Sequence, residues 1–293
     1  MHMERAIKEI AFENKKADHD HFDLVYLEDI VNSTPKDHNQ FEHHKIAFYL
    51  IMIITQEEGE HNINYRDYSF QKGTVFTLRK NNIHKFYKTK AKGKFLVFTE
   101  DFVIRNSNKT ETLKLFQLFN EMLGSPKLQL NDDDFGEIES LIAQIEKEYV
   151  GVNDDYSIEI IRNLVQVLIL KLFRAKSAAN DSLKNKKYYL KFLSFQELVE
   201  KECFESKKVA YYAHKMGVTS KTLNNITQSV IGKPAKSFID QIVILQIKRL
   251  LINSQLSFTE IAYQTGFDAP TNFFQYFRKK TGLSPRQFKE NCQ

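Results

Sequence analysis

The chain contains 293 residues, 42% of them hydrophobic, and carries a formal net charge of +5 at pH 7. This length suits two domains that each bury a core, no apolar run approaches the roughly 20 residues that cross a bilayer, and the N-terminus lacks the apolar stretch of a signal peptide. Cys203 and Cys292 lack the spacing of a disulfide framework or a zinc site, so we expect a cytoplasmic protein without a membrane partner.

Residues 22 to about 102 carry the pattern of short β-strands. Apolar runs recur at four places, residues 48–55, 74–78, 84–89 and 94–99. Turn-like stretches separate these runs, at residues 57–59, 71–73, 80–82 and 91–93. Short strands with turns at this spacing are typical of a small barrel or sandwich, and the first run indicates a buried strand.

Three helices are predicted after the β region. The first covers residues 110–123, and the second begins near Asn131, where the following aspartates suit a helix N-terminus. Residues 157–175 form the most apolar helix of this half, with a stripe wide enough to face two partners. Two interpretations stay open, since this helix could cover the open side of the barrel, form a dimer interface, or do both.

Residues 176–187 are polar, small and charged, as expected for a linker between domains at 1–175 and 188–293. Charge separates at the same place. From Lys184 onward the chain has 18 Lys and Arg against 8 Asp and Glu, whereas the preceding residues have 24 against 29. A basic domain joined to an acidic one indicates a phosphate-binding module, although a solvated basic face is the plainer alternative.

The basic domain repeats one small unit. The first copy contains Ala213-His-Lys-Met-Gly217 and the second Ala262-Tyr-Gln-Thr-Gly266, so that the two glycines stand 49 residues apart. A small residue followed by a turn glycine is what a tight helix–turn–helix needs, because two helices touch at the alanine and the turn requires positive φ. Two copies suggest two recognition helices for DNA.

Capping signals place the helices of the first unit. Ser206 is the predicted N-cap of a helix over residues 207–216, and Thr219 or Ser220 caps a recognition helix over residues 220–230.

A connecting helix follows at residues 234–253, with proline at its start, where the missing N–H costs little. In the second unit, Ser257 is predicted to cap residues 258–265, and Asp268 is predicted to cap the recognition helix over residues 269–281.

The outward faces of the two recognition helices carry side chains suited to DNA. Asn and Gln can pair with the adenine edge in the major groove, and Lys and Arg suit phosphates or a guanine edge. The candidate DNA-binding residues of the first unit are Ser206, Lys207, Ser220, Lys221, Thr222, Asn224, Asn225 and Gln228. Those of the second unit are Pro270, Thr271, Asn272, Gln275, Arg278 and Lys279. A solvated helix surface is the alternative for each one, but the set on two like helices favours DNA.

At these residues the sequence resembles the AraC/XylS-type transcriptional regulators, most closely in the motifs Ile261-Ala-Tyr-Gln-Thr-Gly-Phe267 and Phe273-Phe-Gln-Tyr-Phe-Arg-Lys-Lys-Thr-Gly-Leu-Ser-Pro-Arg-Gln-Phe288. The resemblance covers roughly residues 191–289. It implies a dimeric activator or repressor that binds double-stranded promoter DNA, with recognition helices about 34 Å apart on one face of the duplex. The family often has Ser-Arg where this chain has Phe274-Gln275, which leaves the base preference open.

A weaker resemblance, to the family's cupin-like sensor domains, covers about residues 22–100. It implies an α+β two-domain chain, with an N-terminal cupin-like β-barrel with helices followed by an all-α tandem helix-turn-helix. His44, His61 and His84 are the candidate effector-pocket residues, for a small molecule that the sequence does not identify. Such domains often show His-x3-Glu at the place of His44, but Phe48 replaces the carboxylate, so we predict no metal and no cofactor.

Two other classes of protein stay open. A cupin-type metal enzyme fused to a DNA-binding module would need a metal, which elemental analysis would detect. A DNA-repair alkyl acceptor would need a reactive thiolate, and neither Cys203, on a predicted scaffold helix, nor Cys292, near the C-terminus, suits that role. The sequence therefore predicts a transcription regulator and not an enzyme.

Overall fold

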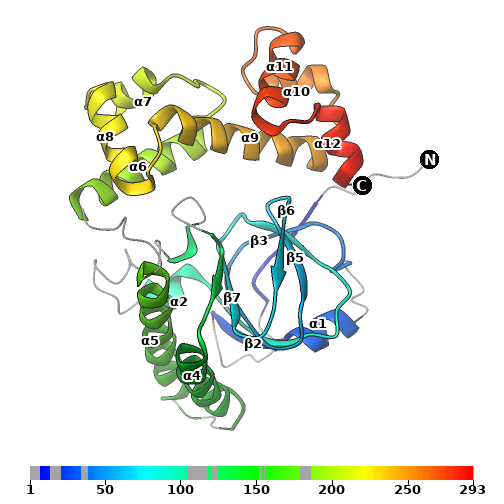
Figure 1. The fold of residues 1–293 in the computed structure, drawn as a ribbon, viewed down its shortest axis with the longest axis vertical. Coiled ribbons are helices and arrows are strands. Elements are labelled where there is room, and N and C mark those ends of the chain that lie inside the picture. Colours follow the sequence, from blue (N-terminus) through cyan, green and yellow to red (C-terminus); the bar gives the residue numbers. More distant parts are fainter. Residues whose placement is uncertain are drawn as a thin grey trace. The chain divides into compact units, whose positions relative to one another are not determined.

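A computed structural model of the protein describes residues 7–13, 21–33, 39–104, 118–120, 125–151, 154, 156–178 and 186–292. The chain divides into two units, one comprising Lys8–Asn180 and the other containing Asp181–Gln293. The first unit combines strands with helices, and the second is built from helices (Figure 1). A two-domain architecture, β-rich and then helical, therefore matches the prediction.

The described strands of the N-terminal unit form two separate five-stranded sheets and no closed barrel. The first sheet has the strand order β1 (Lys8–Ile10), β3 (His44–Ile46), β8 (Ile83–Phe86), β5 (Gly59–Ile63), β6 (Arg66–Phe70). The second has the order β10 (Lys127–Gln129), β7 (Thr74–Leu78), β4 (Tyr49–Gln56), β9 (Lys92–Phe98), β2 (Phe22–Tyr26). Of the two predicted alternatives, the arrangement is thus the sandwich.

Strand β4 separates two apolar cores. Its side chains alternate, as strand geometry requires, so that Ile51 and Ile53 join one cluster of buried residues and Leu50, Met52 and Ile54 join another. The first cluster also contains helical residues, whereas the second is made largely by residues of the two sheets. Burial on both faces explains why this segment is a continuous apolar run.

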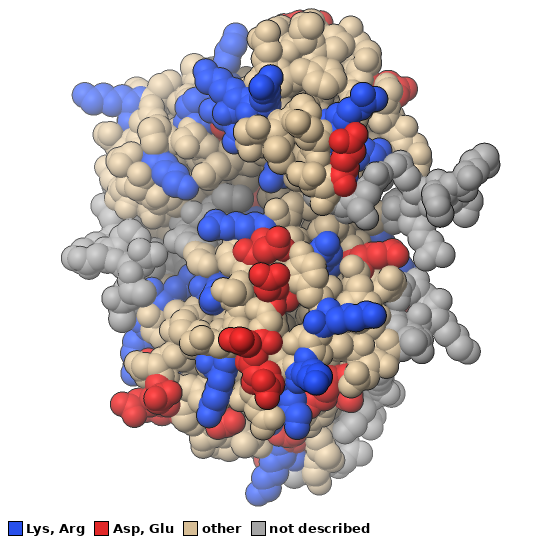
Figure 2. Space-filling model, turned by 45° about the vertical axis from the view of Figure 1, so that its right-hand side comes forward, with Lys and Arg blue, Asp and Glu red and all other residues tan. Residues whose placement is uncertain are grey.

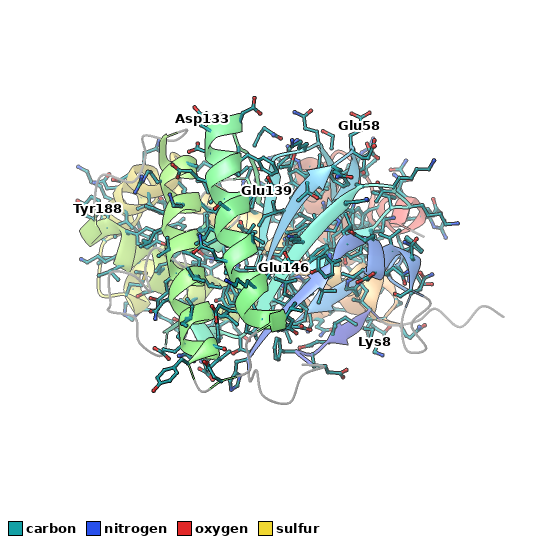
Figure 3. The ribbon with its side chains drawn as sticks, turned by 90° about the horizontal axis from the view of Figure 1, so that it is seen from below. Lys8, Glu58, Asp133, Glu139, Glu146 and Tyr188 are labelled. Carbon is teal, nitrogen blue, oxygen red and sulfur yellow. The ribbon has the colours of Figure 1, made fainter. Side chains whose placement is uncertain are left out.

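Two long helices supply the other half of the first cluster. They are α4 (Asp132–Gly151) and α5 (Ser157–Ala178), and the unit also has the short helices α1 (Leu27–Asn32) and α2 (Glu100–Ile104). Helix α4 begins as predicted, because Asn131 Oδ1 accepts a hydrogen bond of 2.7 Å from the Asp134 N–H. Along α4 (Figure 3), Glu146 accepts from Lys94 Nζ at 2.6 Å and from the Tyr26 hydroxyl, which ties the helix to β9 and β2.

Helix α5 packs into the core along one stripe. Ile161, Val165 and Leu168 are completely buried, so this stripe covers the sheet that contains β4. On its other side, Ile160 and Val167 keep 40% and 43% of their surface exposed. Helix α5 therefore covers the sheet, as one of the two interpretations predicted, and its opposite side keeps an exposed apolar strip. Most of the helix predicted at 110–123 lies outside the described residues.

Seven helices form the described part of the C-terminal unit. They are α6 (Lys186–Glu202), α7 (Val209–Lys215), α8 (Ser220–Ile231), α9 (Ala235–Asn253), α10 (Phe258–Gln264), α11 (Pro270–Thr281) and α12 (Pro285–Cys292). Phe192 and Phe195 of α6 contact Phe238 of α9, with ring centroids 5.0 and 5.3 Å apart. Helices α5 and α6 occupy both ends of the predicted 176–187 linker, since α5 continues to Ala178 and α6 begins at Lys186.

Candidate DNA-binding surface

Two turns with the same hydrogen bonds confirm the repeat seen in the sequence. After α7, Val218 N–H donates to Ala213 O and Gly217 N–H to His214 O, both at 3.0 Å. After α10, Phe267 N–H donates to Ala262 O and Gly266 N–H to Tyr263 O, also at 3.0 Å. Both glycines have positive φ, of 62° and 72°. This pattern is the Schellman motif, and the two alanines before it are buried as predicted.

Capping places α8 and α10 where the sequence predicted them. The Thr219 hydroxyl accepts from Thr222 N–H at 3.0 Å and thereby caps α8. Ser257 and Glu260 form a reciprocal capping box at the start of α10.

Two other predicted caps are wrong. Helix α7 begins at Val209 with Lys208 as its N-cap, and the Ser206 hydroxyl accepts instead from Lys208 N–H at 3.2 Å. Helix α11 has Ala269 as its N-cap and not Asp268, because Pro270 occupies the first helical position and the residue before a proline is held in an extended conformation.

Helix α8 presents an exposed polar face. Lys221, Asn225 and Gln228 are exposed, while Leu223 and Ile226 on the opposite side are completely buried. Ser220 and Thr222 are half-buried at the start of the helix.

The candidate Asn224 differs from the others on α8, because both ends of its amide bind within the protein. Its Nδ2 donates to Ser220 O at 3.1 Å, and its Oδ1 accepts from Ala235 N–H at 2.9 Å. Asn224 thus fastens α8 to the first turn of α9 and satisfies one of the N–H groups that a helix start leaves unpaired.

Helix α11 presents the second polar face. Its exposed candidates are Thr271, Asn272, Gln275, Arg278 and Lys279, and Pro270 is half-buried at the start of the helix. Phe273 and Phe277 are completely buried, as the sequence predicted.

The structure places Lys207 away from these polar faces. Its ammonium group donates to Thr265 O at 2.7 Å and to Gly266 O at 3.2 Å, and lies 4.2 Å from the centroid of the Phe267 ring. Burial lowers the pKa of Lys207. Lys207 therefore binds the turn of the second unit, which the sequence could not show because 58 residues separate Lys207 from Thr265.

Two exposed basic residues that follow the recognition helices in the chain were missed in the sequence analysis. Lys233 and Arg286 are exposed, next to the prolines that precede α9 and begin α12. Each comes shortly after the positive-φ glycine that ends a recognition helix, Gly232 or Gly282. This position after the helix could have identified them in the sequence. In Figure 2, lysine and arginine side chains gather over the helices of the C-terminal unit on the face in view.

The three candidate histidines lie together in the N-terminal unit, on the neighbouring strands β3, β8 and β5. His84 Nδ1 is 3.3 Å from His61 Nε2, and the His44 and His84 rings are 4.1 Å apart. All three are buried, and burial, reinforced by His44, lowers the pKa of His61 to about 3. In the described part of the chain, no group of three His, Cys, Asp or Glu side chains is arranged to hold a metal ion.

Cys203 lacks the reactive thiolate of an alkyl acceptor. The side chain is buried on the loop after α6, and burial raises the pKa of its thiol to about 11. Such a thiol stays protonated at neutral pH. Among the residues that the structure describes, no helix combines the length and the apolar character that a membrane span requires.

Comparison with known proteins extends these observations. A family model described as a helix-turn-helix domain matches residues 212–291. The HTH-type transcriptional activator RhaS of Citrobacter koseri is 22% identical over 261 residues, which cover 85% of this chain and 88% of RhaS. RhaR of Enterobacter sp. (strain 638) is 22% identical over 265 residues, covering 87% and 89%. RhaS of Escherichia coli O139:H28 is 25% identical over 254 residues, covering 85% and 88%.

Among solved structures, ToxT of Vibrio cholerae, bound to an unsaturated fatty acid, is 17% identical with a TM-score of 0.41. The match covers 94% of this chain and 96% of ToxT.

The matched domain and the relatives along most of the chain define a DNA-binding transcription regulator rather than an enzyme. Its C-terminal part is a helix-turn-helix domain, and along most of its length the chain is similar to AraC-type transcriptional regulators.

Proposed function

We propose that the protein controls transcription in the cytoplasm by reading two segments of one promoter with α8 and α11. The observation that carries this proposal is the pair of identical turns, each followed by a helix with a buried apolar side and an exposed polar side. A helix of this kind fits the major groove with its polar side chains against the base edges.

Within each helix the exposed residues divide by chemistry. Asn225 and Gln228 of α8, and Asn272 and Gln275 of α11, can accept and donate to one base at once. Lys221, Thr271, Arg278 and Lys279 complete the contacts to bases and phosphates. Ser206, Ser220, Thr222 and Pro270 keep a supporting role near the helix starts, while Asn224 and Lys207 act inside the protein.

The full chain should bind promoter DNA with an affinity that falls steeply with salt. Five exposed cations lie on the two recognition helices or follow them in the chain: Lys221, Lys233, Arg278, Lys279 and Arg286. Each phosphate contact releases counterions and contributes about −0.9 to the slope of log affinity against log salt, so five contacts predict a slope of about −4 to −5. Titrations at four salt concentrations measure it. Binding that ignores salt, or that never prefers a promoter over random DNA, would contradict the proposed function.

The N-terminal unit, residues 1–175, is proposed to be a cupin-like regulatory domain that senses an effector or dimerises. Its two stacked sheets with a buried cluster of His44, His61 and His84 support a small-molecule site between the sheets. We propose these imidazoles as the polar groups that contact the effector, in apolar surroundings where Phe76 and Phe86 lie against His61 with ring centroids 5.5 and 4.8 Å away.

Dimerisation is proposed through the exposed strip of α5, formed by Ile160 and Val167. An exposed apolar strip on a helix that already buries its other side suits a second helix. Ile160→Glu combined with Val167→Glu should therefore lower the sedimenting mass from dimer to monomer while the circular dichroism spectrum is kept.

Leu168 provides the contrasting variant for this test. It is completely buried against the core, so Leu168→Glu should unfold the domain rather than dissociate a dimer. A wild-type chain that sediments as a monomer at high concentration, or a folded double variant with unchanged mass, would contradict the proposed interface.

A further inference from the structure

The repeat in the C-terminal unit is asymmetric around its two turns. At Gly217 of the first turn, an added Cβ would meet no atom within 4 Å. At Gly266 of the second, it would lie 2.2 Å from Phe204 O, so the loop between α6 and α7 touches this turn backbone to backbone. The loop of the first unit therefore packs against the turn of the second unit, whereas no backbone approaches the turn of the first unit in this way.

Lys207 lies in this contact. Its two hydrogen bonds end on Thr265 O and Gly266 O, which are carbonyls at the C-terminal end of α10. A cation there is favoured by the partial negative charge of a helix C-terminus. With the two turn glycines aligned, the position of Lys207 in the second unit holds Leu256. The lysine is thus present in only one copy of the repeat, where it joins the first unit to the second.

A second contact leads from the connecting helix to the second recognition helix. The carboxylate of Asp240, on α9, accepts from Lys280 Nζ at 2.6 Å and from the Tyr276 hydroxyl at 2.7 Å, both on α11. It also accepts from Lys236 Nζ at 2.5 Å. Burial opposes the charge of Asp240, but these hydrogen bonds outweigh it and hold its pKa below the usual range.

Aromatic rings join the two contacts into one chain. Phe267, beneath the Lys207 ammonium, has its ring centroid 5.2 Å from that of Tyr276, whose hydroxyl binds Asp240. Helix α11 is therefore held through its side chains by the α6–α7 loop of the first unit and by α9. These contacts add to the packing of Phe273 and Phe277, which bury the apolar side of α11.

We propose that Lys207 and Asp240 are positioning residues that fix the separation and angle between the two recognition helices, and so set the spacing between the two DNA segments that the protein selects. This inference rests on the proposed reading of DNA by α8 and α11. Changing the spacing by one base pair moves the segments by about 3.4 Å along the duplex and rotates one against the other. A rigid pair of helices resists this change, and a loosely joined pair tolerates it.

The test is selection of binding sites by the full chain from a pool of randomised duplex DNA, followed by titration of the selected site and of sites with one base pair added or removed. The wild type should prefer its own spacing by about tenfold or more, because a misplaced helix loses its base contacts. Lys207→Met, which keeps the length of the side chain but loses its charge, should select the same bases with a preference of about threefold or less. Lys280→Met, which removes an Asp240 partner at a partly exposed site, should do the same.

Three further variants separate positioning from other roles. Lys207→Arg should restore the wild-type spacing preference, since a guanidinium can donate to both carbonyls and lie over Phe267. Lys208→Met, at the exposed neighbour, should leave the preference unchanged. Lys279→Met should weaken all spacings alike, because a phosphate contact has no dependence on spacing.

The outcomes distinguish the inference from the proposed function on which it rests. If Lys207→Met and Lys280→Met both lower affinity equally at every spacing, the two side chains do not position the helices. If Lys207→Met does not fold, Lys280→Met is the deciding variant: an equal loss of affinity at every spacing contradicts the inference, and a reduced spacing preference supports it. A wild-type selection that yields one continuous segment instead of two would refute the two-helix reading itself.

Discussion

Replacing Asn225 or Gln275 with alanine is expected to lower affinity for the selected site by about tenfold or more, with little change in binding to random DNA. Each side chain is exposed on the outer face of its recognition helix, opposite completely buried packing residues. A bidentate contact to a base is worth about 1–3 kcal/mol of discrimination, and 1.4 kcal/mol corresponds to tenfold. The loss should therefore be confined to the correct sequence.

Titration of each variant against single-base variants of the selected site checks this result. Asn225→Ala should relax one base position and Gln275→Ala another, about one helical turn away. Lys279→Ala is the matched control, since an exposed cation that meets phosphate should weaken all sequences alike. Equal losses on every sequence would mean that the helices hold the protein on DNA without reading bases. Relaxation of the same position by both variants would exclude tandem reading.

Gly266→Ala is expected to destabilise the C-terminal unit strongly and to abolish specific DNA binding. Two costs combine at this position. The residue has a φ of 72°, which costs an alanine about 1–2 kcal/mol. Its Cβ would also lie 2.2 Å from Phe204 O, and relieving such an overlap costs about 1–3 kcal/mol or more. The sum approaches a large part of the stability of a small domain.

Gly217→Ala isolates the backbone cost. This residue has nearly the same φ, 62°, but an added Cβ would meet nothing within 4 Å. Urea denaturation should therefore show a loss of about 1–2 kcal/mol for Gly217→Ala and at least about twice that for Gly266→Ala. Equal losses for the two variants would show that the close approach of the α6–α7 loop to this turn does not exist in solution.

The helical half of the fold could be predicted from sequence because its signals are local. A turn glycine, the alanine before it and the caps Thr219 and Ser257 act within a few residues of each other, and the structure confirms all of them. The failed caps show the limit of such signals. A serine such as Ser206 can bind a neighbouring N–H without starting a helix, and Pro270 holds Ala269 extended, so that the helix begins one residue later than a cap at Asp268 would require.

The β half was harder to predict, because pairing depends on distant residues. The buried strand β4 was found from its apolar run, whereas β1, β3 and β10 have three residues each and too little pattern to detect. Gly93 suggested a turn, yet it lies within β9, where an added Cβ would be 2.6 Å from Ile53 O of the neighbouring strand. There the glycine permits close approach of two strands.

For the candidate site, sequence could name the polar faces but not which side chains turn inward. Asn224 and Asn225 are adjacent asparagines that the sequence cannot tell apart. Only the position of α9 shows that Asn224 accepts a hydrogen bond from the Ala235 N–H. Lys207 likewise resembles a DNA-binding lysine until the second unit is placed beside it.

The connecting helix α9 has a further consequence for how the C-terminal unit melts. Phe238 and Ile242 of α9 are buried in a core shared with α6, and Asp240 binds α11 from the same helix. Neither recognition helix can unfold without removing the partners that hold α9 in place, so both belong to one cooperative unfolding unit. Binding energy gained by one helix on DNA therefore raises the protection of the other against hydrogen exchange, even where the second half of the site is a poor match.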